Sequence, residues 1–164
     1  MREIMLVCLS FASCFHLCNE AQAQPTNAFD FFKSLKGSWN IQSGNRALPI
    51  KMTYDLASKD TIVTESFGKE LSVFYPDGND LMMTHFCNAG NHPRLKLKKT
   101  SSSTLFEFEM VDITNLNASR DGAHVQRITY TLMEPDKLDL KIVWKRGEKE
   151  ESENYVLTRA RSPH

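Results

Sequence analysis

Residues 137–145 read K-L-D-L-K-I-V-W-K, and this stretch carries the pattern that decides the fold. One face would hold Leu138, Leu140, Ile142 and Trp144, and the other would hold Asp139, Lys141 and Lys145. Successive side chains of a β-strand point to opposite faces, so this alternation indicates a strand with one buried and one solvent-facing side. The stretch therefore predicts an antiparallel sheet that is wet on one face.

The same period of two runs along most of the chain in short segments separated by turns. We expect strands at 39–43, 50–56, 61–67, 70–75, 80–87, 94–99, 104–111, 123–132, 137–145 and 153–159. Before them, Phe31, Phe32 and Leu35 share one helical face, which predicts a short N-terminal helix. A meander this long accumulates twist and exposes its edges unless it closes. The prediction is an all-β fold: an up-and-down antiparallel β-barrel of about ten strands with one short helix.

The first 23 residues have the features of a secretory signal peptide. Arg2 precedes an apolar run over residues 4–17, and A-Q-A at 21–23 supplies the small-x-small pattern that a signal peptidase needs. The run is too short to span a bilayer comfortably, and Cys14 lies in only a faint lipoprotein box. We therefore expect a mature domain spanning residues 24–164, in a protein that is exported to the periplasm or secreted.

Charge and cysteine content exclude several classes of protein. The chain has 20 Lys+Arg and 20 Asp+Glu. Residues 1–23 hold one basic and two acidic residues, so the mature chain has 19 and 18, a net charge near +1. A nucleic-acid partner would want a basic excess, so none is expected. Three of the four cysteines lie in the leader, so Cys87 alone remains and no intramolecular disulfide can form.

Side chains capable of chemistry concentrate in residues 84–94, which read T-H-F-C-N-A-G-N-H-P-R. His85 and Cys87 are two apart on a predicted strand, so they share a face. On a later strand His124 and Gln126 share a face in the same way. That second face also holds Ile128, Tyr130 and Leu132. Because both faces are otherwise apolar, we expect both pairs to point into the barrel and the two histidines to approach each other.

Several interpretations fit these residues. The first is the polar corner of a small-molecule pocket, since an apolar cavity with a few convergent polar groups is the usual form of such a site. Its candidate ligand-binding residues are His85, Cys87, Asn91, Arg94, His124, Gln126, Tyr130 and Trp144. The second is a metal or haem site of His85, Cys87 and His124, and the third is catalysis by Cys87 with a histidine base. In the fourth, the histidines are satisfied core residues; no cofactor follows from the sequence.

Gly37-Ser38-Trp39 opens the first predicted strand, and Arg159 lies in the last. This pairing resembles the calycin superfamily of lipocalins and fatty-acid-binding proteins, in which an Arg of the final strand covers a Gly-x-Trp. A guanidinium can stack on an indole and bond nearby carbonyls, which gives the pairing a physical reason. The resemblance implies a lipocalin-like barrel closed at one end by Trp39 and Arg159.

Residues 84–94 also resemble the hallmark T-H-Y-C-x-x-G-N-Q-P-R of a bacterial family of lipocalin-like proteins of unknown function. Phe86 stands where that hallmark has Tyr, and His92 where it has Gln. The family's later H-M-H reads H-V-Q at 124–126 here, which removes one potential metal ligand. This resemblance implies the fold and brings no activity with it.

The sequence thus predicts an exported, single-domain, lipocalin-like barrel that binds a small, largely apolar or amphipathic molecule. One alternative is an enzyme or metalloprotein that uses His85, Cys87 and His124. Another is a structural envelope protein with a filled lumen. The volume of the lumen, and whether these side chains face it, distinguishes the three.

Overall fold

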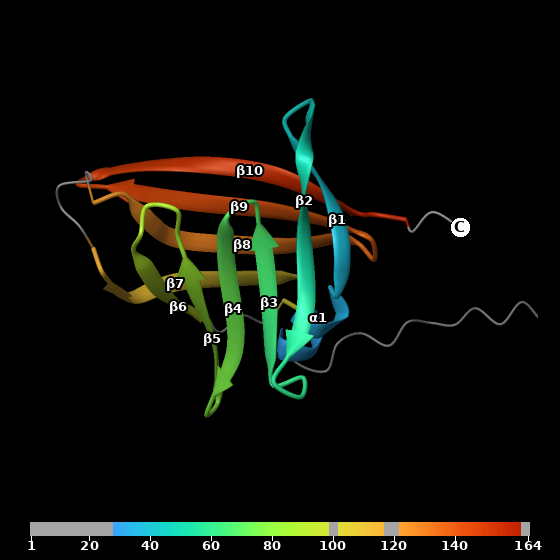
Figure 1. Cartoon of the computed structure of the whole chain (residues 1–164), viewed down its shortest axis with the longest axis horizontal. Helices are drawn as coiled ribbons and strands as arrows, with labels where there is room; N and C mark the ends of the chain where they lie inside the picture. Colours follow the sequence, from blue (N-terminus) through green and yellow to red (C-terminus); the bar gives the residue numbers. More distant parts are fainter. Residues whose placement is uncertain (1–27, 99–101, 117–121, 162–164) are drawn as a thin grey trace, which may run out of the picture.

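Ten antiparallel strands close into one barrel in the computed structural model, which describes residues 28–98, 102–116 and 122–161 (Figure 1). The elements are α1 (Ala28–Ser34), β1 (Gly37–Ser43), β2 (Arg46–Ala57), β3 (Ile62–Phe67), β4 (Glu70–Asp77), β5 (Asp80–Phe86), β6 (His92–Leu97), β7 (Leu105–Thr114), β8 (His124–Glu134), β9 (Lys137–Arg146) and β10 (Lys149–Arg159). Neighbours in sequence are neighbours in the sheet, and β1 pairs with β10 to complete the ring. The predicted all-β up-and-down barrel with a short helix is confirmed. The predicted leader, residues 1–23, lies outside the described residues.

Two hairpins extend beyond the strands predicted from alternation. β2 begins at Arg46 rather than at residue 50, and β10 begins at Lys149 rather than at residue 153. The added residues are mostly exposed. Backbone pairing holds them in the sheet and only Leu48 among them packs against the core, so no alternation of buried side chains marks them in the sequence.

The helix α1 fills one end of the barrel, which we call the closed end (Figure 1). Phe31 stacks on Phe106 with ring centres 4.0 Å apart, and Phe32 stacks on Phe74 at 4.3 Å. Phe32 also meets Tyr130 edge-on at 5.2 Å. Aromatic pairs at such separations gain on the order of 1 kcal/mol beyond the area that they bury. Within the described part of the chain, no helix is long and apolar enough to cross a membrane.

Arg159 ties the closed end together. Its guanidinium lies 4.4 Å from the centre of the Trp39 ring, and the two residues pair directly across β1 and β10. It also donates to the carbonyls of Ser34 and Lys36 at 3.1 and 3.0 Å, and forms an ion pair with Asp136 at 2.7 Å. One side chain therefore joins the first strand, the last strand and the end of the helix.

Candidate functional site

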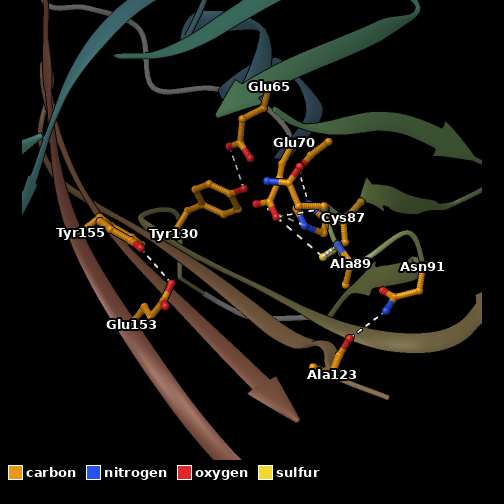
Figure 2. Close-up of polar contacts among 12 residues, drawn as sticks. Glu65, Glu70, Cys87, Ala89, Asn91, Ala123, Tyr130, Glu153 and Tyr155 are labelled. Atoms are coloured by element: carbon orange, nitrogen blue, oxygen red, sulfur yellow. Dashed lines mark hydrogen bonds and ion pairs between the residues drawn. The ribbon is translucent and has the colours of Figure 1, made fainter. Parts of the chain in front are cut away.

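A row of polar residues crosses the inner face of the barrel on β3, β4 and β5, toward the open end, the end opposite α1 (Figure 2). The antiparallel register sets Glu65 opposite Ser72, and Ser72 opposite His85. All three are buried. Glu70, at the start of β4, and Cys87, just after β5, lie beside this row.

Glu65 is a buried carboxylate held by hydroxyl groups. Its Oε2 accepts from the hydroxyls of Tyr54 and Tyr130 at 2.7 and 2.8 Å, and Ser72 bonds the same carboxylate. Burial raises the pKa of Glu65, and these three hydrogen bonds oppose that rise. The pKa values of Tyr54 and Tyr130 are raised well above the ordinary tyrosine value, first by burial and then by the charge of Glu65. The carboxylate and the hydroxyls thus satisfy one another inside the core.

His85 continues this network with one nitrogen and leaves the other bare. Its Nδ1 lies 3.1 Å from the Ser72 hydroxyl. This contact engages Nδ1 and leaves Nε2 as the ring nitrogen that is free to meet another group. Nε2 lies 3.8 Å from Glu70 Oε2 and, among the described residues, is buried without a hydrogen-bond partner. Burial lowers the pKa of His85 to about 4, with a smaller effect of His92, so the ring is neutral near pH 7.

Cys87 lies against the same carboxylate. Its Sγ is 3.7 Å from Glu70 Oε1, and the backbone N–H of Ala89 donates to the sulfur at 3.4 Å. Donor atoms of Glu70, His85 and Cys87 all lie within 4.8 Å of one another, and we call these residues the Glu–His–Cys cluster. Figure 2 shows Glu70 beside Cys87. Burial raises the pKa of the Cys87 thiol. A nucleophilic cysteine needs a lowered pKa, so the catalytic interpretation lacks an activated thiolate.

Two cavities bear on the volume of the lumen. Inside the barrel, beside Glu65, Ser72 and His85, a void measures about 10 Å³, close to the least that one water molecule requires. A second cavity, of about 160 Å³, lies at the open end where the β9–β10 hairpin turns; we call it the open-end cavity. Its lining includes Ala123, Trp144, Lys145, Lys149, Glu151 and Glu153. The described core is therefore nearly filled, and the larger space lies at its mouth.

Trp144 stands between this cavity and the Glu–His–Cys cluster. Its ring meets the His85 ring edge-on, with centres 6.4 Å apart, and it also lines the open-end cavity. Its indole Nε1 is buried, and no residue of the described ranges accepts a hydrogen bond from it. The residue that carries this unpaired donor thus lines the cavity.

A β-bulge on β8 changes the side on which its first residues lie. The register of β8 with β9 shifts between Val125 and Arg127. Val125, paired with Trp144, is fully buried, and so is Ile128 on the other side of the bulge. Three positions separate these two inward residues, so the extra residue has reversed the alternation. Every residue before the bulge therefore faces the side opposite to that expected.

The predicted inward position of His124 is wrong for this reason. His124 pairs with Lys145, next to the inward Val125, and its Nδ1 lies 2.6 Å from the Gly122 carbonyl oxygen. Gln126 is half-buried in the bulge itself. Glu70 rather than His124 joins His85 and Cys87.

Asn91 and Arg94 have partners away from the Glu–His–Cys cluster. The buried Asn91 side chain donates to the Ala123 carbonyl at 2.7 Å, which fastens the β5–β6 turn to the start of β8 (Figure 2). Arg94 is exposed and pairs with Asp112 through its Nε at 2.8 Å. An anionic group inside the barrel would therefore not meet Arg94.

Glu65, Glu70 and Ser72 are not among the site residues predicted from the sequence, although the alternation of the strands indicates that they face inward. Glu65 stands two residues before Phe67, on the face of β3 that otherwise turns apolar side chains inward. Glu70 and Ser72 precede the buried Phe74 at the same spacing. A polar residue in a row of inward apolar ones must find a partner, which makes it a candidate for a network or a site.

No model of a known protein family matches this chain, and no curated protein matches it either. The fold and the site therefore define the class of protein. It is a closed ten-stranded antiparallel β-barrel, consistent with a calycin-like fold, plugged by a helix at one end and carrying buried polar groups toward the other. A barrel of this architecture is compatible with ligand binding at its mouth.

Proposed function

We propose that the protein binds a small amphipathic molecule in the open-end cavity, with Trp144 as the main contact. The observation that carries this proposal is the buried indole N–H of Trp144, which has no acceptor within the described residues and lies beside a cavity of about 160 Å³. A buried donor without a partner costs about 1–3 kcal/mol. A small rotation of the indole would bring this N–H to a ligand that covers the ring, and an acceptor on that ligand would remove the cost.

The size of the cavity favours a compact ligand. Drug-sized ligands occupy pockets of about 300–1,000 Å³, whereas this cavity measures about 160 Å³ and the void behind it about 10 Å³. Phe32 and Tyr130 fill the middle of the barrel from opposite sides. A long acyl chain has no room there, so the ligand would be a single ring or a short chain.

The charges around the cavity select a ligand with a polar head. Glu151 and Glu153 lie on the same face of β10 as Tyr155, and Tyr155 donates to Glu153 at 2.8 Å. Lys145 and Lys149 line the same cavity. An ammonium head would meet the carboxylates, and a carboxylate head the lysines, while the apolar part rests on the indole.

We further propose that the protein acts after export and removal of residues 1–23. The support is the apolar run followed by A-Q-A at 21–23. We also propose a kinship with the bacterial family whose hallmark residues 84–94 resemble. Three residues of that stretch, His85, Cys87 and Asn91, are buried toward the open end, which is where a shared binding role would need them.

Nuclear magnetic resonance of the ¹⁵N-labelled protein tests the ligand proposal directly. The chain has two tryptophans, so the indole N–H signals of Trp144 and Trp39 report on the open and closed ends in one spectrum. The probes are phenethylamine, phenylacetate and benzyl alcohol, which share a ring and differ in charge. We expect at least one of them to shift the Trp144 signal saturably while the Trp39 signal stays in place. Trp144→Phe should abolish binding, and Trp39→Phe assigns the remaining signal.

Two results would overturn the proposal. In one, none of the three probes moves the Trp144 signal saturably. In the other, both indole signals move together, which indicates non-specific association. Native mass spectrometry of the protein purified from its own host then identifies the natural ligand as a mass that is lost in Trp144→Phe.

A further inference from the structure

We propose that Glu70, His85 and Cys87 bind one divalent metal ion of the zinc type. This site is separate from the open-end cavity and does not depend on the ligand proposed for it. It differs from the metal site expected from the sequence, because Glu70 on β4 takes the place assigned there to His124.

The distances from Glu70 to the other two donors are those found around a metal ion, and all three donors lie within 4.8 Å of one another. Zinc binds sulfur at about 2.3 Å and nitrogen or oxygen at about 2.0–2.2 Å, so donors of a tetrahedral site lie roughly 3.3–3.8 Å apart. Glu70 lies 3.8 Å from His85 Nε2 through one oxygen and 3.7 Å from Cys87 Sγ through the other. Small rotations of these side chains bring all three donors to one ion.

An independent observation is the state of His85. The residue is only 5% exposed, and its Nε2 has no hydrogen-bond partner in the ranges that the structure describes. The Ser72 hydroxyl engages Nδ1, so Nε2 is the ring nitrogen turned toward the carboxylate of Glu70. A buried nitrogen without a partner is costly, and a cation held between it and the carboxylate would remove that cost.

Neighbouring groups hold each donor in place. The Ser72 hydroxyl holds His85 Nδ1 at 3.1 Å, and a hydrogen bond to the nitrogen that does not bind the metal orients metal-binding histidines. The backbone N–H of Asn88 donates to Glu70 at 3.2 Å, and that of Ala89 donates to the sulfur of Cys87. These bonds restrict rotation of the carboxylate and stabilise negative charge on the sulfur.

The set of one thiolate, one imidazole and one carboxylate selects the ion. A thiolate favours zinc and the softer divalent ions over magnesium and calcium, which prefer oxygen ligands alone. Binding forms the metal–sulfur bond and releases the thiol proton of Cys87 to the buffer. Three protein ligands leave a fourth tetrahedral position for water.

Cobalt(II) titration of the full chain tests the site, because thiolate-bound cobalt has a charge-transfer absorption and zinc then displaces it. We expect one ion per chain. Cys87→Ser should remove the charge-transfer band. Glu70→Gln and His85→Gln should each weaken cobalt binding more than about 100-fold. Ser72→Ala, which removes a group that supports a ligand, should weaken it roughly 10–100-fold. The matched control His124→Gln should leave the affinity unchanged, and circular dichroism checks that each variant folds.

Two results overturn the site. In one, the cobalt band survives in Cys87→Ser, which means that the sulfur comes from the cysteines at positions 8, 14 and 18. In the other, His124→Gln weakens binding as much as His85→Gln. X-ray absorption of the zinc-loaded wild-type chain needs no variant. It should show one sulfur at about 2.3 Å and lighter donors at about 2.0–2.2 Å. A shell without sulfur, or with more than one, contradicts the proposal.

Discussion

At the closed end, Trp39 donates its indole N–H to the Leu35 carbonyl at 2.8 Å, whereas Trp144 at the open end has a buried indole N–H with no acceptor among the described residues. The nitrogen-bearing side chains Arg159 and His85, at the closed and the open end, differ in the same way. Arg159 at the closed end bonds two carbonyls and a carboxylate. His85 faces Glu70 with a bare nitrogen.

The contrast extends to the whole part of the chain that the structure describes. There, the buried side-chain polar atoms without a partner belong to His85, Asn91, His92 and Trp144. All four residues lie toward the open end. Folded proteins satisfy nearly all such atoms, so their accumulation at one end means that this end is not optimised for stability. The closed end stabilises the fold, and the open end carries groups that a bound species can satisfy.

The largest expected effect is at the closed end. Trp39→Ala should destabilise the protein by about 3–5 kcal/mol, because it empties the space of a fully buried aromatic and removes the surface on which Arg159 stacks. Chemical denaturation measures the free energy of unfolding. Val111→Ala, at a side chain that is 52% exposed, is the control and should lose less than about 0.5 kcal/mol. A loss that small in Trp39→Ala would mean that this residue does not hold the closed end.

Between the two ends, the Glu65 network should make stability sensitive to alkali. The folded-state pKa values of Tyr54 and Tyr130 are raised, so these groups ionise first in the unfolded chain. Their contribution is complete below pH ~10, the ordinary tyrosine pKa, and is lost as pH rises toward the folded values. The wild type should therefore be less stable at pH 11 than at pH 9.

Unfolding free energies at pH 9 and pH 11 check this prediction. Tyr130→Phe should lower stability at pH 9, because Glu65 loses one of its donors. The same variant should show a smaller loss between the two pH values than the wild type. Equal losses in both proteins would show that Tyr130 is not the group that titrates.

At the open end, His85→Leu should change the free energy of unfolding by only about 1 kcal/mol. The substitution conserves bulk and removes a buried nitrogen that no described residue satisfies, which is favourable. It also removes the hydrogen bond with Ser72, which is unfavourable, so the two effects offset each other. Metal binding should fall much more than stability. A variant that unfolds readily while its folded fraction binds normally would make His85 a structural residue.

The smallest effect is expected outside the barrel. Arg94→Ala removes an exposed pair with Asp112, and surface pairs of this kind contribute little. The melting temperature and the binding of all three aromatic probes should stay within experimental error. A clear loss of phenylacetate binding alone would bring Arg94 back into the site.

The sequence predicted the architecture because each strand repeats the same information. Residues 137–145 show alternation, and β9 buries Leu138, Leu140 and Ile142 as that alternation requires. Strand ends were less predictable, since the exposed start of β10 at Lys149 carries no apolar pattern.

The candidate site was predicted only in part, for two physical reasons. A bulge adds one residue to a strand without changing its composition. The bulge between Val125 and Arg127 therefore reversed the face that alternation assigns to His124. Glu70 and His85 come together only through the pairing of β4 with β5, and a single sequence does not specify which strands pair or in what register. The faces of His85 and Cys87 were predictable because no register shift interrupts β5 in that pairing.

The joint between β1 and β10 governs the order in which the chain can fold. Arg159 reaches Lys36 across 123 positions of sequence, whereas every other strand pair joins successive strands. Contacts so distant form late, since closing a long loop costs entropy before the contact repays it. Until β10 docks, the meander is an open sheet with two unpaired edges, each able to capture the complementary edge of another copy. The contacts of Arg159 at the closed end form only when β10 docks on β1. The time needed to form them is therefore the time during which the unclosed barrel can exchange strands or aggregate.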